Sequence, residues 1–176
     1  MQDARDSSAP PTLHFLCGKA GAGKSTVAAR LAASRHAILV CEDVWLARLF
    51  GDRMHTFDDY RQFAQRLKTV VGPLVVDLLR AGCSVVLDCP ANTRAARAWM
   101  RSLYEQAGAA HVLHYVATSD PTCLARIAQR NSEKPEGSHQ LSEEDFVHIS
   151  SFFEAPDAAE GFNIQVHGER GDAAAP

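Results

Sequence analysis

The sequence predicts a three-layer α/β fold in which helices cover both faces of a central, mainly parallel five-stranded sheet. Two observations lead to this prediction. Apolar segments alternate along the chain with segments of helical periodicity, as in proteins built from strand–helix–strand units. The apolar segments are nearly continuous rather than alternating with polar residues, which is typical of parallel strands buried on both sides. In such folds the ligand binds at the carboxyl ends of the strands.

The elements can be placed by their patterns and by the residues that end them. The expected strands are 13–17, 37–41, 84–88, 111–116 and a weaker one at 163–167. The expected helices are 24–34, 44–50, 58–80 with a break at Gly72-Pro73, 93–106, 121–130 and 142–154. Helix ends are marked by Thr93 and Asp120 as N-cap types, and by Gly82 and Gly108 after the last turns. A polar segment at 131–141 is expected to be either an ordinary loop or a short lid.

The length, charge and cysteine content of the chain limit the classes of protein to which it can belong. The 176 residues are 46% apolar and 22% charged with a net charge of −3, which suits one globular domain, expected here over residues 12–167. Residues 1–11 and 168–176 are expected to be disordered ends, and nothing predicts a signal peptide or a membrane partner. Five cysteines without C-x-x-C spacing indicate reduced thiols in a cytoplasmic protein rather than a metal site. The mildly acidic charge disfavours a nucleic-acid partner, and the oligomeric state stays open.

The strongest motif lies between the first expected strand and helix. Residues 18–25 read GKAGAGKS and fit G-x-x-x-x-G-K-[ST], a glycine-rich loop whose backbone N–H groups surround phosphates. Lys24 is expected to reach the β- and γ-phosphates of a nucleotide, and the Ser25 hydroxyl to coordinate Mg²⁺. The expected nucleotide-binding residues are Gly18, Ala20, Gly21, Ala22, Gly23, Lys24, Ser25 and Thr26.

Other sequence features narrow the kind of nucleotide protein. The N-K-x-D sequence of guanine-specific switches is missing from the chain. Ring-forming and transporter ATPases carry Asp-Glu after an apolar strand, whereas here the strand SVVLD ends in Asp88 and continues with Cys89. A small phosphotransferase, in which a second substrate supplies the nucleophile, is the class that remains.

Over residues 12–167 the chain resembles the small P-loop kinases of the adenylate-kinase-like group, and most closely the kinases grouped with zeta toxin, chloramphenicol phosphotransferase, gluconate kinase and polynucleotide 5′-kinase. The resemblance implies the P-loop fold with a short lid, the use of ATP and Mg²⁺, and transfer of the γ-phosphate to a hydroxyl. A small-molecule acceptor is favoured because the sequence gives no evident aromatic stacking platform for nucleic acid. The alternatives are a polynucleotide 5′-kinase and a nucleotide-responsive ATP-binding protein with little turnover.

The same resemblance assigns roles to four residues. In CEDVWLARLFG, Asp43 matches the aspartate that accepts the proton of the attacking hydroxyl, with Glu42 as the alternative base. Asp88 would orient the acceptor or hold a water on Mg²⁺. Arg126 and Arg130 match the R-x-x-x-R that precedes the lid and would bring positive charge to the γ-phosphate. The plainer interpretations are a first-turn helix acid for Asp43, a turn former for Asp88 and surface positions for the two arginines.

A further helix opens with Arg94 and Arg97 and carries Arg101, all spaced to share one face. Cations in the first turns oppose the helix dipole, so an anionic group is expected to face them. Arg94 and Arg97 are therefore assigned to acceptor binding. The alternative is a solvated face with an Arg101–Glu105 pair.

Overall fold

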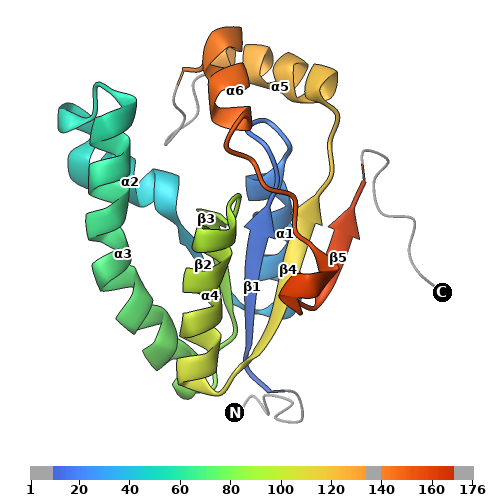
Figure 1. Cartoon of the computed structure of the whole chain (residues 1–176). Helices are drawn as coiled ribbons and strands as arrows, with labels where there is room; N and C mark the ends of the chain where they lie inside the picture. The colour runs from blue at the N-terminus through green and yellow to red at the C-terminus, as the bar shows by residue number, and fades with distance from the viewer. Residues whose placement is uncertain (1–9, 134–139, 169–176) are drawn as a thin grey trace.

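The computed structural model describes residues 10–133 and 140–168, with strands and helices in the predicted order (Figure 1). The strands are β1 (Thr12–Cys17), β2 (Ile38–Cys41), β3 (Val85–Pro90), β4 (Ala110–Val116) and β5 (Ile164–His167). The helices are α1 (Lys24–Arg35), α2 (Glu42–Phe50), α3 (Phe57–Arg80), α4 (Arg94–Ala107), α5 (Asp120–Glu133) and α6 (Glu143–Ser150), with short 3-10 turns at Gly51–Arg53 and Ala158–Glu160. Most of both expected disordered ends, and residues 134–139 of the expected lid, lie outside the described residues.

All five strands are parallel and form one sheet in the order β2-β3-β1-β4-β5, which confirms the predicted fold class. The chain moves from β1 outward to one side of the sheet and then returns to build the other side. This reversal places the carboxyl ends of β1 and β3 side by side at the centre of one edge. Such a switch point is where open α/β sheets bind ligands.

Two apolar cores lie on opposite faces of the sheet. On one face, Leu13 and Phe15 of β1 pack with buried residues of α2, α3 and α4. On the other face, Leu16 of β1 packs with buried residues of α1, α5 and α6. The central strands β1 and β3 are buried on both sides because helices cover both faces, which explains their continuous apolar sequences, whereas the edge strands β2 and β5 are partly exposed. Within the described ranges, no helix is both long and apolar enough to span a lipid bilayer.

The predicted break in α3 is wrong, because the helix continues through Pro73 to Arg80. A proline inside a helix costs about 3 kcal/mol, since it removes one backbone hydrogen bond and crowds the preceding turn. Eight buried α3 residues offset this cost, among them Val71 and Val75 on either side of the proline. Gly72 faces α4, where a Cβ would lie at ordinary contact distance, 3.5 Å from Leu103. Tertiary packing therefore overrides the local signal.

The predicted extent of the last helix, 142–154, is also too long. α6 ends at Ser150, and the chain then turns so that the backbone N–H of Glu154 donates to the carbonyl of Asn92. Ser142 begins α6 with a capping box shared with Asp145, which explains why the start was predictable. The end depends on a contact with a residue far away in sequence.

Three buried histidines form a hydrogen-bonded row across the sheet. His14 Nδ1 of β1 lies 3.0 Å from His114 Nε2 of β4, and His114 Nδ1 lies 2.9 Å from His167 Nε2 of β5. Burial, helped by the charge of Arg35, lowers the pKa of His14 to about 4. Burial, helped by the neighbouring His14 and His167, lowers the pKa of His114 to about 3. His14 and His114 are therefore core histidines that stay neutral near pH 7.

Acid is therefore expected to unfold this protein through these groups. Their native pKa values lie below the ordinary 6.5, so below pH 6.5 the unfolded state binds more protons and stability falls as pH decreases. We expect a loss of about 2 kcal/mol per histidine at about pH 5. Urea unfolding at two pH values should show a smaller loss in His114→Gln, and an unchanged loss in the exposed control His55→Gln. Equal pH dependence in all three proteins would contradict the assignment.

Candidate functional site

The glycine-rich loop joins β1 to α1 at the centre of the carboxyl edge, as predicted. Its backbone needs glycine at Gly21 and Gly23, whose φ angles are +74° and +103°. A Cβ on Gly21 would also lie 2.4 Å from the carbonyl oxygen of Cys123, so α5 presses directly on the loop. The loop is therefore shaped by both its own sequence and its neighbours.

Helix α1 begins without a cap, in contrast to α3 and α6. Gly23 is its N-cap and gives no side-chain hydrogen bond, and no acidic residue lies in the first turn. The N-termini of α3 and α6 are each closed by a capping box. The uncapped N–H groups of α1 fit an anion supplied from outside the chain. Ser25 and Thr26 stand exposed in this first turn, with their hydroxyls available to such a ligand.

Lys24 folds back over the loop that it follows. Its Nζ donates to the carbonyl oxygens of Gly18 at 2.6 Å and Lys19 at 2.9 Å. Burial lowers the pKa of Lys24, while the negative charges of Asp88 and Asp43 act in the opposite direction. Both predicted carboxylates lie at the same sheet edge as the loop, because Asp88 ends the apolar part of β3 beside β1 and Asp43 lies in the first turn of α2, directly after β2.

Residues from the other side of the loop hold its outer turn. The carbonyl oxygen of Ala22 accepts hydrogen bonds from Arg126 at 2.7 Å and from the Thr118 hydroxyl at 3.0 Å. Arg126 Nη1 also lies near Gly23, 3.1 Å from the position of a Cβ there. Arg126 therefore reaches the phosphate loop itself. The role of Thr118 was not predicted, because a single threonine after a strand carries no distinctive signal.

The loop entrance depends on Asn92, a second residue that the sequence did not single out. Its Oδ1 accepts the backbone N–H of Gly18 at 2.9 Å, and its carbonyl accepts the N–H of Glu154. Asn92 follows β3 and directly precedes Thr93, the N-cap of α4. Asn92 thus connects the start of the phosphate loop through its side chain, and the C-terminal segment through its backbone carbonyl, to the start of α4.

The two candidate bases at the start of α2 occupy different environments. Glu42 is 3% exposed, accepts a hydrogen bond from the Tyr60 hydroxyl at 2.9 Å, and has its pKa raised by burial. Asp43 is half-buried in the same first turn. Asp88 ends the apolar part of β3 and accepts a weak hydrogen bond from the Cys41 thiol at 3.6 Å. Of the two bases, Asp43 is the more accessible to an acceptor.

Arg130 lies one turn beyond Arg126 on α5 and is half-buried. Its Nε is buried and has no hydrogen-bond partner among the described residues. The helix continues past it to Glu133, so the segment predicted as a polar loop starts later than expected. Asn131 joins the two sides of that segment, since its amide donates to the carbonyl of Leu141 at 2.8 Å.

The expectation that Arg97 binds the acceptor is wrong, because its side chain is fully buried. Arg97 donates to both carboxylate oxygens of Glu160, at 2.7 and 2.8 Å, and to the carbonyls of Ala91 and Glu154. The anion that faces this arginine belongs to the chain's own C-terminal segment.

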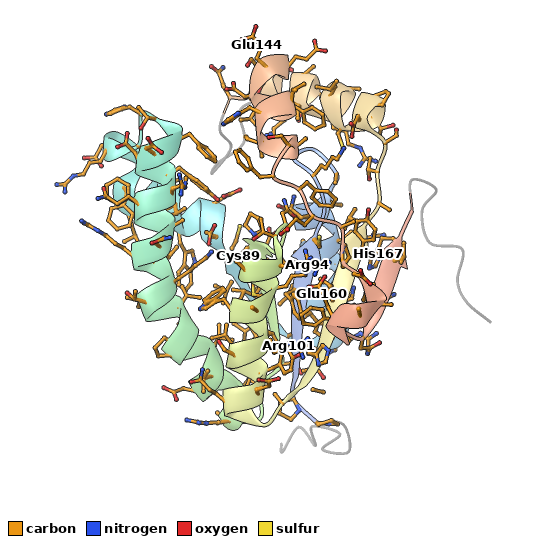
Figure 2. The ribbon with its side chains drawn as sticks, in the orientation of Figure 1. Cys89, Arg94, Arg101, Glu144, Glu160 and His167 are labelled. Atoms are coloured by element: carbon orange, nitrogen blue, oxygen red, sulfur yellow. The ribbon has the colours of Figure 1, made fainter. Side chains whose placement is uncertain are left out.

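Arg94 and Arg101, the other two arginines on this helix face, also contact the C-terminal segment that contains Asp157 and Glu160 (Figure 2). Arg94 is exposed, and its guanidinium lies 3.7 Å from Asp157. Arg101 donates to the carbonyl of Glu160 and also pairs with Glu105 at 3.7 Å. The prediction that the three arginines share one helix face is therefore correct, but the groups that they contact belong to this chain itself. A contact of Arg94 with an acceptor stays a prediction.

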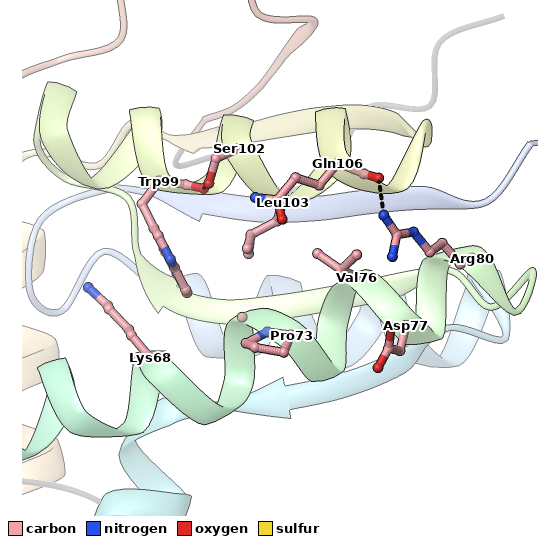
Figure 3. A pocket seen from close by; sticks show the side chains of 10 residues that line it. Lys68, Pro73, Val76, Asp77, Arg80, Trp99, Ser102, Leu103 and Gln106 are labelled. Carbon is pink, nitrogen blue, oxygen red and sulfur yellow. Dashed lines mark hydrogen bonds between the residues drawn. The ribbon is translucent and has the colours of Figure 1, made fainter.

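A hollow of about 460 Å³ between α3 and α4 lies apart from the phosphate loop (Figure 3). Lys68 from α3 stands over the ring of Trp99 from α4, at 5.1 Å. At the other end of the hollow, Arg80 donates to the carbonyl of Gln106 at 2.8 Å. These contacts join two helices and bring together none of the predicted site residues.

Oxygen atoms suited to Mg²⁺ are present at the loop. The Ser25 hydroxyl and the Asp88 carboxylate are hard ligands, and this ion is normally held by one or two such groups plus waters and phosphates. The described residues hold no cluster of three or more His, Cys, Asp or Glu side chains that could bind a metal by themselves. The donor set thus fits a magnesium ion bound together with a nucleotide.

Comparisons with known proteins identify the family of this chain. Residues 13–156 match the profile of a family described as an AAA domain. The chain belongs to this AAA-domain family. No curated protein matches the chain.

Solved structures show that this AAA domain has a P-loop kinase fold. A candidate kinase of Chloroflexus aurantiacus is 17% identical with a TM-score of 0.73, covering 90% of this chain and 88% of its own. Kti12 of Chaetomium thermophilum, solved with ADP-AlF3, is 14% identical with a TM-score of 0.69, covering 92% and 91%. The APS kinase CysC of Mycobacterium tuberculosis, solved with AMPPNP and APS, is 19% identical with a TM-score of 0.62, covering 93% and 91%. The predicted resemblance to small P-loop kinases is confirmed at the level of fold.

Proposed function

We propose that this protein is an ATP-dependent kinase that transfers the γ-phosphate to a hydroxyl of a small molecule. The observation that carries the proposal is the placement of two carboxylates at the sheet edge that holds the phosphate loop, since Asp88 lies on β3 beside β1 and Asp43 lies in the first turn of α2, directly after β2. A loop that holds phosphate and a carboxylate that faces it are the two parts that phosphoryl transfer to an alcohol requires. A cytoplasmic location stays a prediction.

Each group has a distinct task in this proposal. The phosphate loop and Lys24 bind and orient the triphosphate, and Arg126 and Arg130 add positive charge from α5. Asp43 orients the acceptor hydroxyl and takes its proton. Ser25 and Asp88 hold Mg²⁺, which when bound with ATP neutralises charge on the β- and γ-phosphates. Water is a poor competitor, because the sequence lacks the glutamate that activates it in ring-forming ATPases.

The similarity to Kti12 supports keeping a second candidate, a nucleotide-responsive ATP-binding protein with little turnover. ADP release in the presence of a library of alcohols, nucleosides and 5′-hydroxyl oligonucleotides separates the candidates. A kinase should release ADP much faster with one acceptor class, and stimulation by oligonucleotides alone would indicate a polynucleotide 5′-kinase. Tight ATP binding without stimulation by any member would support the nucleotide-responsive protein instead.

Asp43→Asn is expected to lower acceptor phosphorylation by about 10²- to 10⁴-fold, because the amide cannot take a proton. The Kd for ATP should change little, since Asp43 lies on the acceptor side. Steady-state kinetics and calorimetry provide the two measurements. Asp52→Asn, which removes an exposed carboxylate from the turn after α2, is the matched control and should leave both values unchanged. Full activity of Asp43→Asn would transfer the role of base to Glu42.

A further inference from the structure

Four aromatic rings from two distant parts of the chain meet above the phosphate-loop edge of the sheet. Phe57 and Tyr60 of α3 lie 6.2 Å apart and nearly parallel. The ring of Phe57 meets His148 of α6 edge-on at 6.5 Å, and His148 meets Phe152 edge-on at 5.2 Å. Figure 1 shows α6 above the carboxyl edge of the sheet and the N-terminal end of α3 near the top of the molecule on the left. We call Phe57, Tyr60, His148 and Phe152 the ring cluster.

Two members of the ring cluster, Phe57 and Phe152, contribute little to the packing of the fold. Phe57 is 47% exposed and Phe152 is 57% exposed, and neither belongs to the two apolar cores. Single exposed apolar residues are common, but neighbouring aromatic rings from two elements form an apolar patch of the kind that marks a binding site. A planar ring placed among them would cover the exposed faces.

Tyr60 connects the ring cluster to the acceptor side of the site. Its hydroxyl donates to Glu42 Oε1 at 2.9 Å, and Glu42 directly precedes Asp43, the proposed base. The buried Cys89 thiol also hydrogen-bonds the Glu42 carboxylate, so Glu42 is held by the chain itself and the neighbouring Asp43 stays the acid open to an acceptor. Tyr60 thus joins the ring cluster to the start of α2, where both carboxylates lie.

The charges around the ring cluster disfavour an anionic ligand. Glu42 and Asp43 lie at its inner end. A hollow of about 600 Å³ on the surface of α6, lined by His148, is edged by Glu143 and Glu144. An anionic molecule would be repelled by this set of carboxylates.

We propose that the ring cluster binds the acceptor, and that the acceptor is an alcohol that carries a planar aromatic ring and no negative charge. A nucleoside and a simple aryl alcohol share this chemistry. The inference rests on the proposed function in one respect, since it is Asp43 that receives the hydroxyl. The sequence had indicated no aromatic platform, because the four rings come from segments about ninety residues apart and meet only in the fold.

The test compares ring-bearing alcohols with ring-free partners by ligand-observed NMR on the full chain. The pairs are cytidine against ribose, and 2-phenylethanol against 2-cyclohexylethanol, each with Mg²⁺ and a non-hydrolysable ATP analogue present to occupy the nucleotide site. We expect the aromatic member of at least one pair to bind about five-fold or more tightly than its partner. Phe57→Leu and Phe152→Leu should each weaken that binding by about five-fold or more, while Val70→Ala, an exposed change on α3, should have no effect.

The outcomes separate this inference from the proposed function. Selective binding of cytidine alone identifies a nucleoside, and selective binding of both aromatic members shows that the ring alone suffices. Equal binding within both pairs, or aromatic binding that survives both phenylalanine changes, overturns the inference. ADP release in the wild type and in Lys24→Ala reports on the kinase activity independently, so ring binding without phosphoryl transfer would refute the proposed function only.

Discussion

Lys24→Ala is expected to lower phosphoryl transfer at least about a hundred-fold and to weaken ATP binding, while leaving the fold intact. The ammonium group lies over the loop, held by the carbonyl oxygens of Gly18 and Lys19, and no apolar core depends on it. With a triphosphate bound, the same group would stabilise the charge that develops on the transferred phosphoryl, an effect of about 10²–10³ for a single donor elsewhere. Isothermal calorimetry and acceptor-dependent ADP release measure the two losses.

A second variant in the same loop controls for charge alone. Lys19 precedes the glycine-rich turn and pairs with Asp120 at 2.5 Å, on the outer side of the loop. Lys19→Ala removes one positive charge nearby and should reduce activity far less than Lys24→Ala. Burial lowers the pKa of Lys24, so removing its side chain should not lower the free energy of unfolding by more than about 1 kcal/mol. Equal activity losses in the two variants would contradict a specific role for Lys24.

The layers of the fold and the phosphate loop were predictable because their signals are local. Buried parallel strands need continuous apolar residues, and the loop needs glycine at φ angles that other residues rarely adopt. Helix starts were predictable for the same reason, as the capping box at Ser142 shows. Each of these features depends on residues within a few positions of one another.

The features that sequence reasoning missed depend on distant partners. Pro73 indicated a broken helix, but packing against α4 and the sheet keeps α3 continuous. Thr118 and Asn92 support the phosphate loop from positions 96 and 74 residues away in sequence. Composition and spacing contain no information about such pairs.

The choice between the two adjacent acids needed burial, which the sequence does not give. Glu42 and Asp43 differ by one position, so helical geometry points their side chains about 100° apart around α2. The structure buries Glu42 against Tyr60 and leaves Asp43 more open. Glu42 thereby accepts a hydrogen bond from Tyr60, whereas Asp43 is the acid that we propose meets the substrate.

Arg97 is the residue whose interpretation changed most, and replacing it should have the largest effect on stability. Arg97→Met is expected to lower the free energy of unfolding by about 3–5 kcal/mol, because it leaves Glu160 near the core without its partner. For a chain of this size the melting temperature would fall by roughly 10 °C. The loss should also reach the site, since Arg97 holds the carbonyls of Ala91 and Glu154 around Asn92, which fixes the start of the phosphate loop.

Two further variants distinguish a buried ion pair from an ordinary surface contact. Arg94→Met removes the same side chain from the same helix, but Arg94 is exposed and 3.7 Å from Asp157, so it should cost less than about 1 kcal/mol. Combining Arg97→Met with Glu160→Leu removes both charges and should recover a large part of the loss, because apolar replacements often match a buried pair in stability. Equal losses for Arg97→Met and Arg94→Met would show that the Arg97–Glu160 pair adds nothing special, and the arginine face would again be open to an acceptor.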